Sequence, residues 1–294
     1  MNRYRFGNIE VISDIDISYE LKILNQELSL NLSSDLPYHS VEIMKYTDKV
    51  KEEYKGMRRR VRNPITGFEV WEGENKILNA SKDMVLVISE NCYKIFYKNR
   101  KNLYGYIRAK VCEIIRNNYI KGSLFAIHGA LIAKDKRYVL VVGSKGSGKT
   151  SSMLHALKKQ WGIFTDELVL VDKNYKVSVL RRFPALDKEV IKEYFPEMMD
   201  KEVVTINNYM NNEEKVLLDL VSDKYLNINF NMINKVYILA MVDNKTVKDD
   251  YKKDILLKNW ISGCGDINSE LKDFKKLISI SEITTIEEIK KLLV

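Results

Sequence analysis

Cysteine, proline and glycine are all scarce in this 294-residue chain, which contains three Cys, four Pro and 13 Gly. The cysteines, Cys92, Cys112 and Cys264, are widely spaced and form no CxxC pair, which argues against a zinc site or a disulfide framework and favours a reducing compartment. No apolar run approaches the roughly 20 residues that a membrane span requires. The opening MNRYRFGNIEVISD lacks the apolar core of a signal peptide. We therefore expect a cytoplasmic protein that does not cross a membrane.

Charged residues are plentiful, and their balance is positive. They make up 30% of the chain against 45% hydrophobic residues, which argues against long disordered stretches. A chain of 294 residues suffices for one large domain, or for a medium domain with a smaller companion. The 48 Lys and Arg residues exceed the 40 Asp and Glu residues by 8. This excess is compatible with nucleic acid, an acidic surface or an anionic ligand, and does not choose among them.

The first part of the chain is rich in strand patterns. RFGNIEVISDIDIS alternates apolar and polar side chains, which predicts a half-buried strand with apolar positions at Ile9, Val11, Ile15 and Ile17. Residues 68–98 contain short apolar alternations separated by turn residues, which predicts a small antiparallel meander. LYGYIRAKVCEIIRNNYI has helical spacing up to Gly122. We set a boundary near residue 120, with residues 1–120 as a β-rich region for substrate binding or regulation and residues 121–294 as the core.

The second part has an α/β pattern. SLFAIHGALIA and RYVLVVG are apolar, β-rich runs separated by a turn, and a helix is expected from about Lys149 to Gln160. IFT and LVLVD are expected as short buried strands interrupted by Asp166 and Glu167. Further strands are expected at KVSVLRRFP and VYILAMVDN, and amphipathic helices at ALDKEVIKEYF and TIEEIKKLLV. The residues with chemical potential are concentrated between His128 and Pro184.

One segment has a specific motif. GSKGSGKT, from Gly143 to Thr150 (hereafter the glycine loop), matches the P-loop pattern GxxxxGK[ST] and stands between an expected strand and an expected helix. Its glycines allow several main-chain N–H groups to point at phosphate oxygens, at the positive end of the helix. Lys149 is placed to bridge the outer phosphates, and the Thr150 hydroxyl to bind Mg²⁺. The residues predicted to hold phosphate are Gly143, Ser144, Lys145, Gly146, Ser147, Gly148, Lys149, Thr150 and Ser151.

The loop alone does not identify the enzyme class, but two classes are disfavoured. A GTP switch needs a DxxG segment, and this sequence has none. Guanine recognition needs NKxD, whereas DNKTV ends in Val247. A transporter-type LSGGQ signature is also missing from the sequence.

The order of motifs around the loop resembles a known family. IHGALIA with His128 and Gly129 comes first, then the glycine loop, then GIFTDELVLVD. This order is similar to the catalytic domain of HPr kinase/phosphorylase and to its shorter relatives, which phosphorylate ribosomal peptide precursors such as lasso peptides. The resemblance covers about residues 124–184. It implies an HPr kinase/PEP-carboxykinase-like P-loop core with a mixed sheet, preceded by a smaller β-rich region.

The resemblance also implies roles for single residues. The glycine loop would hold the phosphates of ATP and Mg²⁺, with Lys149 in the catalytic set. Asp166 would be the catalytic carboxylate, and Glu167 stands where the family usually has a second Asp, as a metal ligand with Thr150. His128 matches the family histidine beside the active site. The signature segment of the full kinase/phosphorylase is not evident after these positions, which disfavours phosphorylase activity.

The chemistry of the residues agrees with these roles, and each residue also has a simpler structural interpretation. A carboxylate between two apolar strands is partly desolvated, which raises its basicity and suits Asp166 as acceptor of a hydroxyl proton; a solvated turn acid is the alternative. His128 could equally be a hydrogen-bonded core histidine. Arg181 and Arg182 could bind a transferred phosphate or an acidic substrate, or lie at an ordinary solvated strand end.

The basic run KGMRRRVR, residues 55–62, has two open interpretations. It is compatible with a surface helix or a loop, and either with a dock for an acidic leader or substrate peptide or with a solvated basic face. The aromatic interleaving typical of nucleic-acid contact is sparse, so nucleic acid is disfavoured.

The expected function is a Mg²⁺/ATP-dependent kinase that acts on a Ser or Thr hydroxyl of a protein or peptide. Phosphorylation of a small-molecule hydroxyl, such as that of serine, is the first alternative. A nucleotide-binding regulatory module without chemistry is the second. Homo-oligomerisation stays open.

Overall fold

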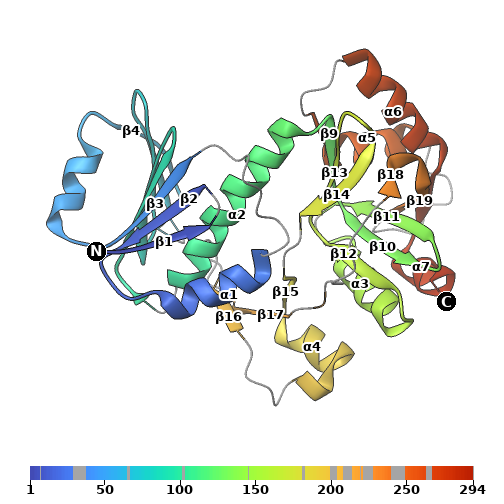
Figure 1. Cartoon of the computed structure of the whole chain (residues 1–294), viewed down its shortest axis with the longest axis horizontal. Coiled ribbons are helices and arrows are strands. Elements are labelled where there is room, and N and C mark those ends of the chain that lie inside the picture. Colours follow the sequence, from blue (N-terminus) through green and yellow to red (C-terminus); the bar gives the residue numbers. More distant parts are fainter. Residues whose placement is uncertain are drawn as a thin grey trace. The chain divides into compact units, whose positions relative to one another are not determined.

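The computed structural model describes most of the chain as two compact units. The described residues are 1–6, 8–28, 38–64, 67–100, 103–144, 146–180, 183–198, 204–207, 214–218, 220, 228–239, 249–262 and 267–293. One unit contains Met1–Arg116, Ala185–Lys188 and Lys201–Leu218, and the other contains Asn117–Pro184, Glu189–Asp200 and Asp219–Val294. Unlike the ranges expected from the sequence, neither unit is continuous along the chain. The elements of both are labelled in Figure 1.

The first unit is built on an eight-stranded mixed sheet with the order β1-β2-β3-β8-β7-β6-β5-β4. Its strands are β1 (Asn2–Phe6), β2 (Ile9–Ser13), β3 (His39–Lys45), β4 (Arg58–Arg62), β5 (Glu69–Glu72), β6 (Ile77–Ala80), β7 (Met84–Ser89) and β8 (Cys92–Tyr97). The unit also contains α1 (Ser18–Leu28), a 3-10 helix (Asp48–Tyr54), most of α2 (Leu103–Gly122) and a small sheet of β15 (Ala185–Leu186), β17 (Glu214–Leu217) and β16 (Val204–Asn207).

Two sequence predictions for this unit are confirmed. Strands β5 to β8 form the antiparallel meander predicted for residues 68–98. The helix predicted up to Gly122 is α2. The meander buries a cluster of apolar side chains, Val50, Leu78, Ala80, Val85, Val87 and Phe96, against which Tyr54 and Trp71 pack. Alternating side chains on these strands therefore supply one face of the first unit's core.

The opening strand differs from the prediction. The chain forms the antiparallel pair β1 and β2, and β2 ends at Ser13 although the apolar alternation continues to Ile17. The strand stops because side chains take over the hydrogen bonds of the main chain: the Ser13 hydroxyl accepts the N–H of Ile15, and the Asp16 carboxylate accepts the N–H of Ser18 at the start of α1. The alternation alone could not reveal this turn.

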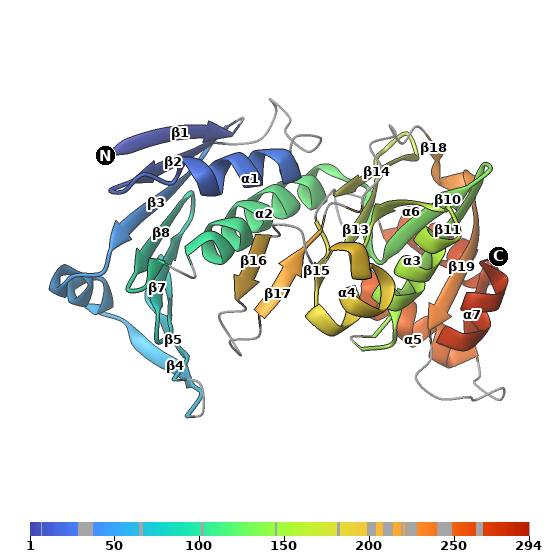
Figure 2. The same ribbon diagram turned by 90° about the horizontal axis from the view of Figure 1, so that it is seen from below.

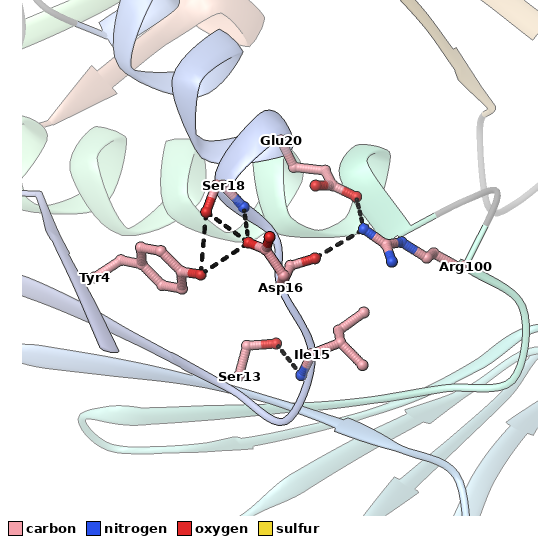
Figure 3. A network of polar contacts seen from close by, with 7 residues as sticks. All are labelled: Tyr4, Ser13, Ile15, Asp16, Ser18, Glu20 and Arg100. Carbon is pink, nitrogen blue, oxygen red and sulfur yellow. Dashed lines mark hydrogen bonds and ion pairs between the residues drawn. The ribbon is translucent and has the colours of Figure 1, made fainter. Parts of the chain in front are cut away.

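A polar network surrounds this turn, and Figure 3 shows it from close by. The Tyr4 hydroxyl donates to the Asp16 carboxylate at 3.3 Å, and the Arg100 guanidinium donates to the Asp16 carbonyl at 2.8 Å. Arg100 also pairs at 3.5 Å with Glu20, whose side chain is only 11% exposed. Arg100 therefore joins the segment before α2 to the turn before α1.

The basic run is a strand. Arg58 to Arg62 form β4, which ends the order of the sheet (Figure 2) and exposes all five side chains. Its arginines pair with acidic side chains of β5: Arg59 and Arg62 with Glu69, and Arg60 with Glu72. The solvated basic face is thus the arrangement seen, on a strand that neither sequence interpretation included.

The second unit contains two five-stranded sheets. One has the order β12 (Gly162–Thr165), β10 (Ala130–Lys134), β11 (Arg137–Gly143), β19 (Ile233–Leu239) and β21 (Ser281–Thr284). The other has the order β18 (Ile228–Asn229), β14 (Lys176–Leu180), β13 (Leu168–Val171), β9 (Phe125–His128) and β20 (Trp260–Ser262). The helices are α3 (Lys149–Lys158), α4 (Lys188–Tyr194), α5 (Asp249–Asn259), α6 (Ile267–Ser279) and α7 (Ile286–Leu292), with short 3-10 turns at Pro196–Met198 and Phe230–Met232.

The core of the second unit joins both sheets. Leu140 and Val142 of β11 belong to one large apolar cluster with side chains of β9, β13, β14, α5 and α6. Val139 and Val141, also buried, alternate with them and point to the opposite face, where α3 contacts the sheet. Within the cluster the ring of Phe125 stacks on Trp260, with centroids 4.2 Å apart. Strand β11, which leads into the glycine loop, is thus fixed on both faces.

These elements confirm the α/β class of the sequence prediction. The predicted turn between the two apolar runs is a tight hairpin, in which Asp135 and Lys136 have φ of 49° and 63°. One expectation is corrected: SLFAIHGALIA is broken at Gly129 into β9 and β10, which lie in different sheets. Within the described residues, no helix is both long and apolar enough to cross a membrane.

Candidate phosphate-binding site

Strand pairing places the two sequence motifs at one edge of a sheet. Strand β10 pairs antiparallel with β11 on one side and with β12 on the other, so β11 and β12 run parallel to each other. Ala130 pairs with Val141, two residues before the glycine loop, and Leu131 pairs with Thr165, the residue before Asp166. The loop and Asp166 therefore leave the sheet at the same edge, where the carboxyl ends of strands commonly carry binding sites.

The conformation of the glycine loop requires its glycines. Gly146 and Gly148 have φ of 83° and 96°, a region that other residues rarely adopt, and Gly148 is the N-terminal cap of α3. At Gly143 the constraint is space, because a Cβ atom would collide with the Ser147 hydroxyl and lie 3.2 Å from the Cβ atom of Leu239. The main chain of the loop therefore packs closely at Gly143 and leaves no room there for a side chain.

Lys149 lies at the first position of α3 and folds back onto the loop. Its Nζ donates to the carbonyl oxygens of Gly143 at 2.6 Å and of Ser144 at 3.2 Å. Burial lowers the pKa of Lys149, and the negative charge of Asp166 opposes that shift. The charge of Asp166, which follows β12, thus acts on the ammonium group of Lys149, which lies at the start of α3.

Asp166 and Glu167 lie where the chain passes from one sheet to the other. Strand β12 ends at Thr165 in the first sheet and β13 begins at Leu168 in the second, so the interrupted strand of the sequence prediction is in fact two strands of two sheets. The chain makes the same passage at Gly129, between β9 and β10. The Gly129 N–H donates to the Glu167 carbonyl at 3.1 Å, which ties the two crossings together.

Gly129 has a spatial reason to be glycine. A Cβ atom there would lie 2.8 Å from the carbonyl oxygen of Val141 and 3.0 Å from Cγ1 of Val142. The first contact is closer than real Cβ atoms show and would require the main chain of β11 to move, and the second would require the Val142 methyl group to give way. The HG pair noted in the sequence therefore marks a close approach of two strands.

A residue that sequence reasoning missed holds the crossing at Asp166 and Glu167 in place. Thr165 is fully buried, and its hydroxyl donates to the Leu180 carbonyl at 2.8 Å. The same oxygen accepts the N–H groups of Glu167 at 3.0 Å and Leu168 at 3.2 Å. The only sequence signal was a threonine directly before two acids, a weak sign of a side chain that hydrogen-bonds a turn.

The structure brings several predicted site residues together. Asp166 and Glu167 are half-buried at the crossing, and His128 is exposed and pairs with Leu168 across β9 and β13. His128 thus lies on the surface beside the acids, in place of the core position that was its alternative. Ser144 and Thr150 are exposed at the glycine loop, and Ser151 is half-buried. Lys145, Arg181 and Arg182 lie outside the described residues.

Two polar residues near the site, His155 and Asp172, hold neighbouring elements of the fold. The His155 ring on α3 contacts the Lys290 carbonyl at 3.0 Å, which links α3 to α7. The Asp172 carboxylate accepts the N–H groups of Asn174 and Lys176 and so holds the turn after β13. Asp243, a carboxylate that follows β19 in the sequence, lies outside the described residues.

The residues present fit a phosphate group with a divalent cation. The buried Ser147 hydroxyl has no hydrogen-bond partner among the described residues, and the start of α3 offers main-chain N–H groups next to Lys149. Thr150, Asp166 and Glu167 supply the hard oxygen ligands that Mg²⁺ prefers. No group of three or more His, Cys, Asp or Glu side chains in the described part of the chain could hold a metal.

Comparison with known proteins adds no family to these observations. Neither the protein-family models nor the curated proteins contain a match to this sequence. The resemblance to HPr kinase/phosphorylase therefore rests on the motifs of residues 124–184.

Proposed function

We propose that the chain is a Mg²⁺/ATP-dependent kinase of the HPr-kinase-like type that phosphorylates a Ser or Thr hydroxyl of a protein or peptide in the cytoplasm. The observation that carries this proposal is the shared sheet edge, at which the glycine loop and the Asp166 crossing leave the same sheet. The charge of Asp166 also opposes the lowering of the pKa of Lys149. Phosphoryl transfer needs phosphate positioning and an acceptor for the hydroxyl proton, and this edge offers groups for both.

In this proposal each group has one task. The main-chain N–H groups of the glycine loop and Lys149 hold the β- and γ-phosphates of ATP. Thr150 and an acid of the crossing would hold Mg²⁺, which would neutralise charge on the phosphates. The acceptor hydroxyl oxygen forms a bond to the γ-phosphorus as the bond to the bridging oxygen of ADP breaks. The hydroxyl proton passes to the Asp166 carboxylate.

The protein or peptide acceptor is supported by the family resemblance alone. The groups at the sheet edge support transfer to a hydroxyl without selecting its source. Incubation with MgATP and candidate acceptors, followed by mass spectrometry, separates a phosphorylated peptide from a phosphorylated small molecule such as phosphoserine.

The decisive variant is Asp166→Asn, which removes the proton acceptor and preserves the size of the side chain. We expect ATP affinity within about threefold of the unmodified protein and transfer from labelled ATP reduced at least about 100-fold, since general base catalysis contributes ~10²–10⁴. Asp172→Asn is the matched control: it makes the same change at the other end of β13, where the carboxylate only holds a turn.

Undiminished transfer by Asp166→Asn would remove Asp166 from the proposed role. ATP binding without a phosphorylated product from any acceptor would replace the kinase by a nucleotide-binding regulatory module.

A further inference from the structure

A buried hydroxyl beside the candidate base is fully engaged in hydrogen bonds. Thr165 donates one bond to the Leu180 carbonyl and accepts two, from the N–H groups of Glu167 and Leu168. One donor and two acceptor positions are all that a hydroxyl offers. The three bonds reach β14 on one side and the start of β13 on the other, and they enclose Asp166 between two fixed main-chain points.

The direction of the Asp166 side chain depends on this main chain. Asp166 follows the last residue of β12 and precedes the change of sheet, so no continuous ladder orients its peptide planes. The bond from the Gly129 N–H holds the carbonyl of Glu167, and the Thr165 hydroxyl holds its N–H. The Thr165 hydroxyl thus supplies side-chain hydrogen bonds to the main chain of this turn.

We propose that Thr165 is a positioning residue of the site. Its hydroxyl fixes the main chain of the crossing, so that the Asp166 carboxylate is directed toward Lys149 and the glycine loop. This inference rests on the proposed function and deepens it, because it assigns the orientation of the candidate base to a residue that touches neither nucleotide nor acceptor. A displacement of about 1 Å in such a group can reduce a rate about 100-fold.

Three substitutions at this position separate the hydroxyl from the shape of the side chain. Thr165→Val preserves the shape and removes all three hydrogen bonds. Thr165→Ser preserves the hydroxyl and removes a methyl group. Thr165→Cys replaces the hydroxyl with a thiol, which is a weak donor and acceptor. It takes the place of the valine variant if circular dichroism shows that Thr165→Val is unfolded at the assay temperature.

The first measurement is MgATP binding and turnover, with water as the acceptor and with any acceptor found for the unmodified protein. For Thr165→Val we expect an unchanged MgATP affinity, within about threefold, and a turnover about 10- to 100-fold lower. Thr165→Ser should stay within about threefold in both. In an Asp166→Asn background, Thr165→Val should have no further effect on turnover, because a positioning residue acts only through its target.

The second measurement is the titration of Lys149, read from its acetylation rate over a range of pH by mass spectrometry. Asp166→Asn removes the charge that opposes the lowered pKa of Lys149, so this pKa should fall further. Thr165→Val should move it in the same direction and Thr165→Ser should not. Lys258, on α5 and paired with Asp254, is an internal control that no variant should shift.

The outcomes separate this inference from the proposed function. If the unmodified protein transfers no phosphoryl group, the kinase proposal fails, and the Lys149 titration still decides the role of Thr165. If transfer occurs and Thr165→Val, folded, leaves both turnover and the Lys149 titration unchanged, Thr165 only stabilises the core and the inference is overturned.

Discussion

The main-chain N–H of Gly129 donates a 3.1 Å hydrogen bond to the main-chain carbonyl of Glu167, and so joins the two points at which the chain passes between the sheets of the second unit. His128 lies directly before the first point, and Asp166 lies at the second. This bond explains why an HG pair and a DE pair that are far apart in the sequence lie next to each other. It also makes Gly129 a sensitive position.

We expect Gly129→Ala to destabilise the protein by about 1–3 kcal/mol, because its Cβ would press on the Val141 carbonyl and overpacking at such contacts costs about this much. Phosphoryl transfer should fall with it, since β11 leads into the glycine loop. Urea denaturation measures the stability. Gly122→Ala is the control: a Cβ there meets nothing within 4 Å, and at the end of α2 the change should be neutral or stabilising by up to about 1 kcal/mol. Equal losses in both variants would contradict the spatial explanation.

Gly143→Ala should weaken ATP binding at least about tenfold, because the added methyl group meets the Ser147 hydroxyl and displaces the main-chain N–H groups of the loop. Ser147→Ala removes that hydroxyl, so the double variant should bind ATP better than Gly143→Ala alone. Isothermal titration with MgATP measures both. A double variant no better than the single one would mean that Leu239, and not Ser147, limits the space at Gly143.

Glu53 should make the stability of the first unit depend on pH. Burial raises the pKa of Glu53, but hydrogen bonds from Lys94 and Lys76, both at 3.1 Å, outweigh it and hold the pKa below its ordinary value. A carboxyl of lowered pKa stabilises the fold above its unfolded-state pKa, and this contribution is lost as the pH falls from about 5 to about 3.

Glu53→Gln should therefore lower the free energy of unfolding by up to about 1 kcal/mol at pH 7, and the difference should shrink toward pH 3. Urea denaturation at the two pH values gives the comparison. Glu52→Gln, in an exposed pair with Lys55, should make little difference at either pH. A Glu53→Gln difference that grows on acidification would reverse the assigned sign.

The arginines of β4 should prevent the exposed edge of this strand from pairing with another copy of the chain. The strand ends the order of its sheet, and its pairing with β5 shifts register between Arg59 and Val61, so a bulge falls at Arg60. Charge and bulges on an edge strand oppose pairing with another chain. Replacing Arg58, Arg60 and Arg62 with Thr should promote concentration-dependent self-association, seen by light scattering. Replacing Lys49, Lys51 and Lys55 with Thr removes the same charge next to the strand, and equal association there would point to net charge alone.

The elements that the sequence predicts well are those with strong local signals. The glycine loop, the Asp135–Lys136 hairpin and α2 follow from residue type and spacing over a few turns or strands. The passage between sheets at Gly129 and Asp166 has no such signal, because an apolar strand looks the same whichever sheet it joins. The role of Thr165 depends on Leu180, which is 15 residues away, and appears only when β12, β13 and β14 are in place.

Other differences have equally specific causes. The four arginines of β4 conceal a strand whose exposed charges are matched only after Glu69 and Glu72 of β5 pair beside them. The apolar positions Ile15 and Ile17 prolong the strand pattern beyond the turn that Ser13 and Asp16 make. The sequence gives little signal for helix α5, because its residues DDYKKDILLKN are mostly charged and Ile255 and Leu256 are its buried apolar side chains among those described.

The tryptophans, among them Trp260 stacked on Phe125, are divided between the two units, and this has a practical consequence for spectroscopy. The chain contains three tryptophans. Trp161 and Trp260 belong to the second unit, whereas Trp71 lies in the meander of the first, edge-on to Tyr54. A Trp71→Phe variant would therefore restrict tryptophan fluorescence, excited selectively over that of tyrosine, to the unit that carries the glycine loop. The melting of that unit could then be followed optically, apart from its companion, with and without added nucleotide.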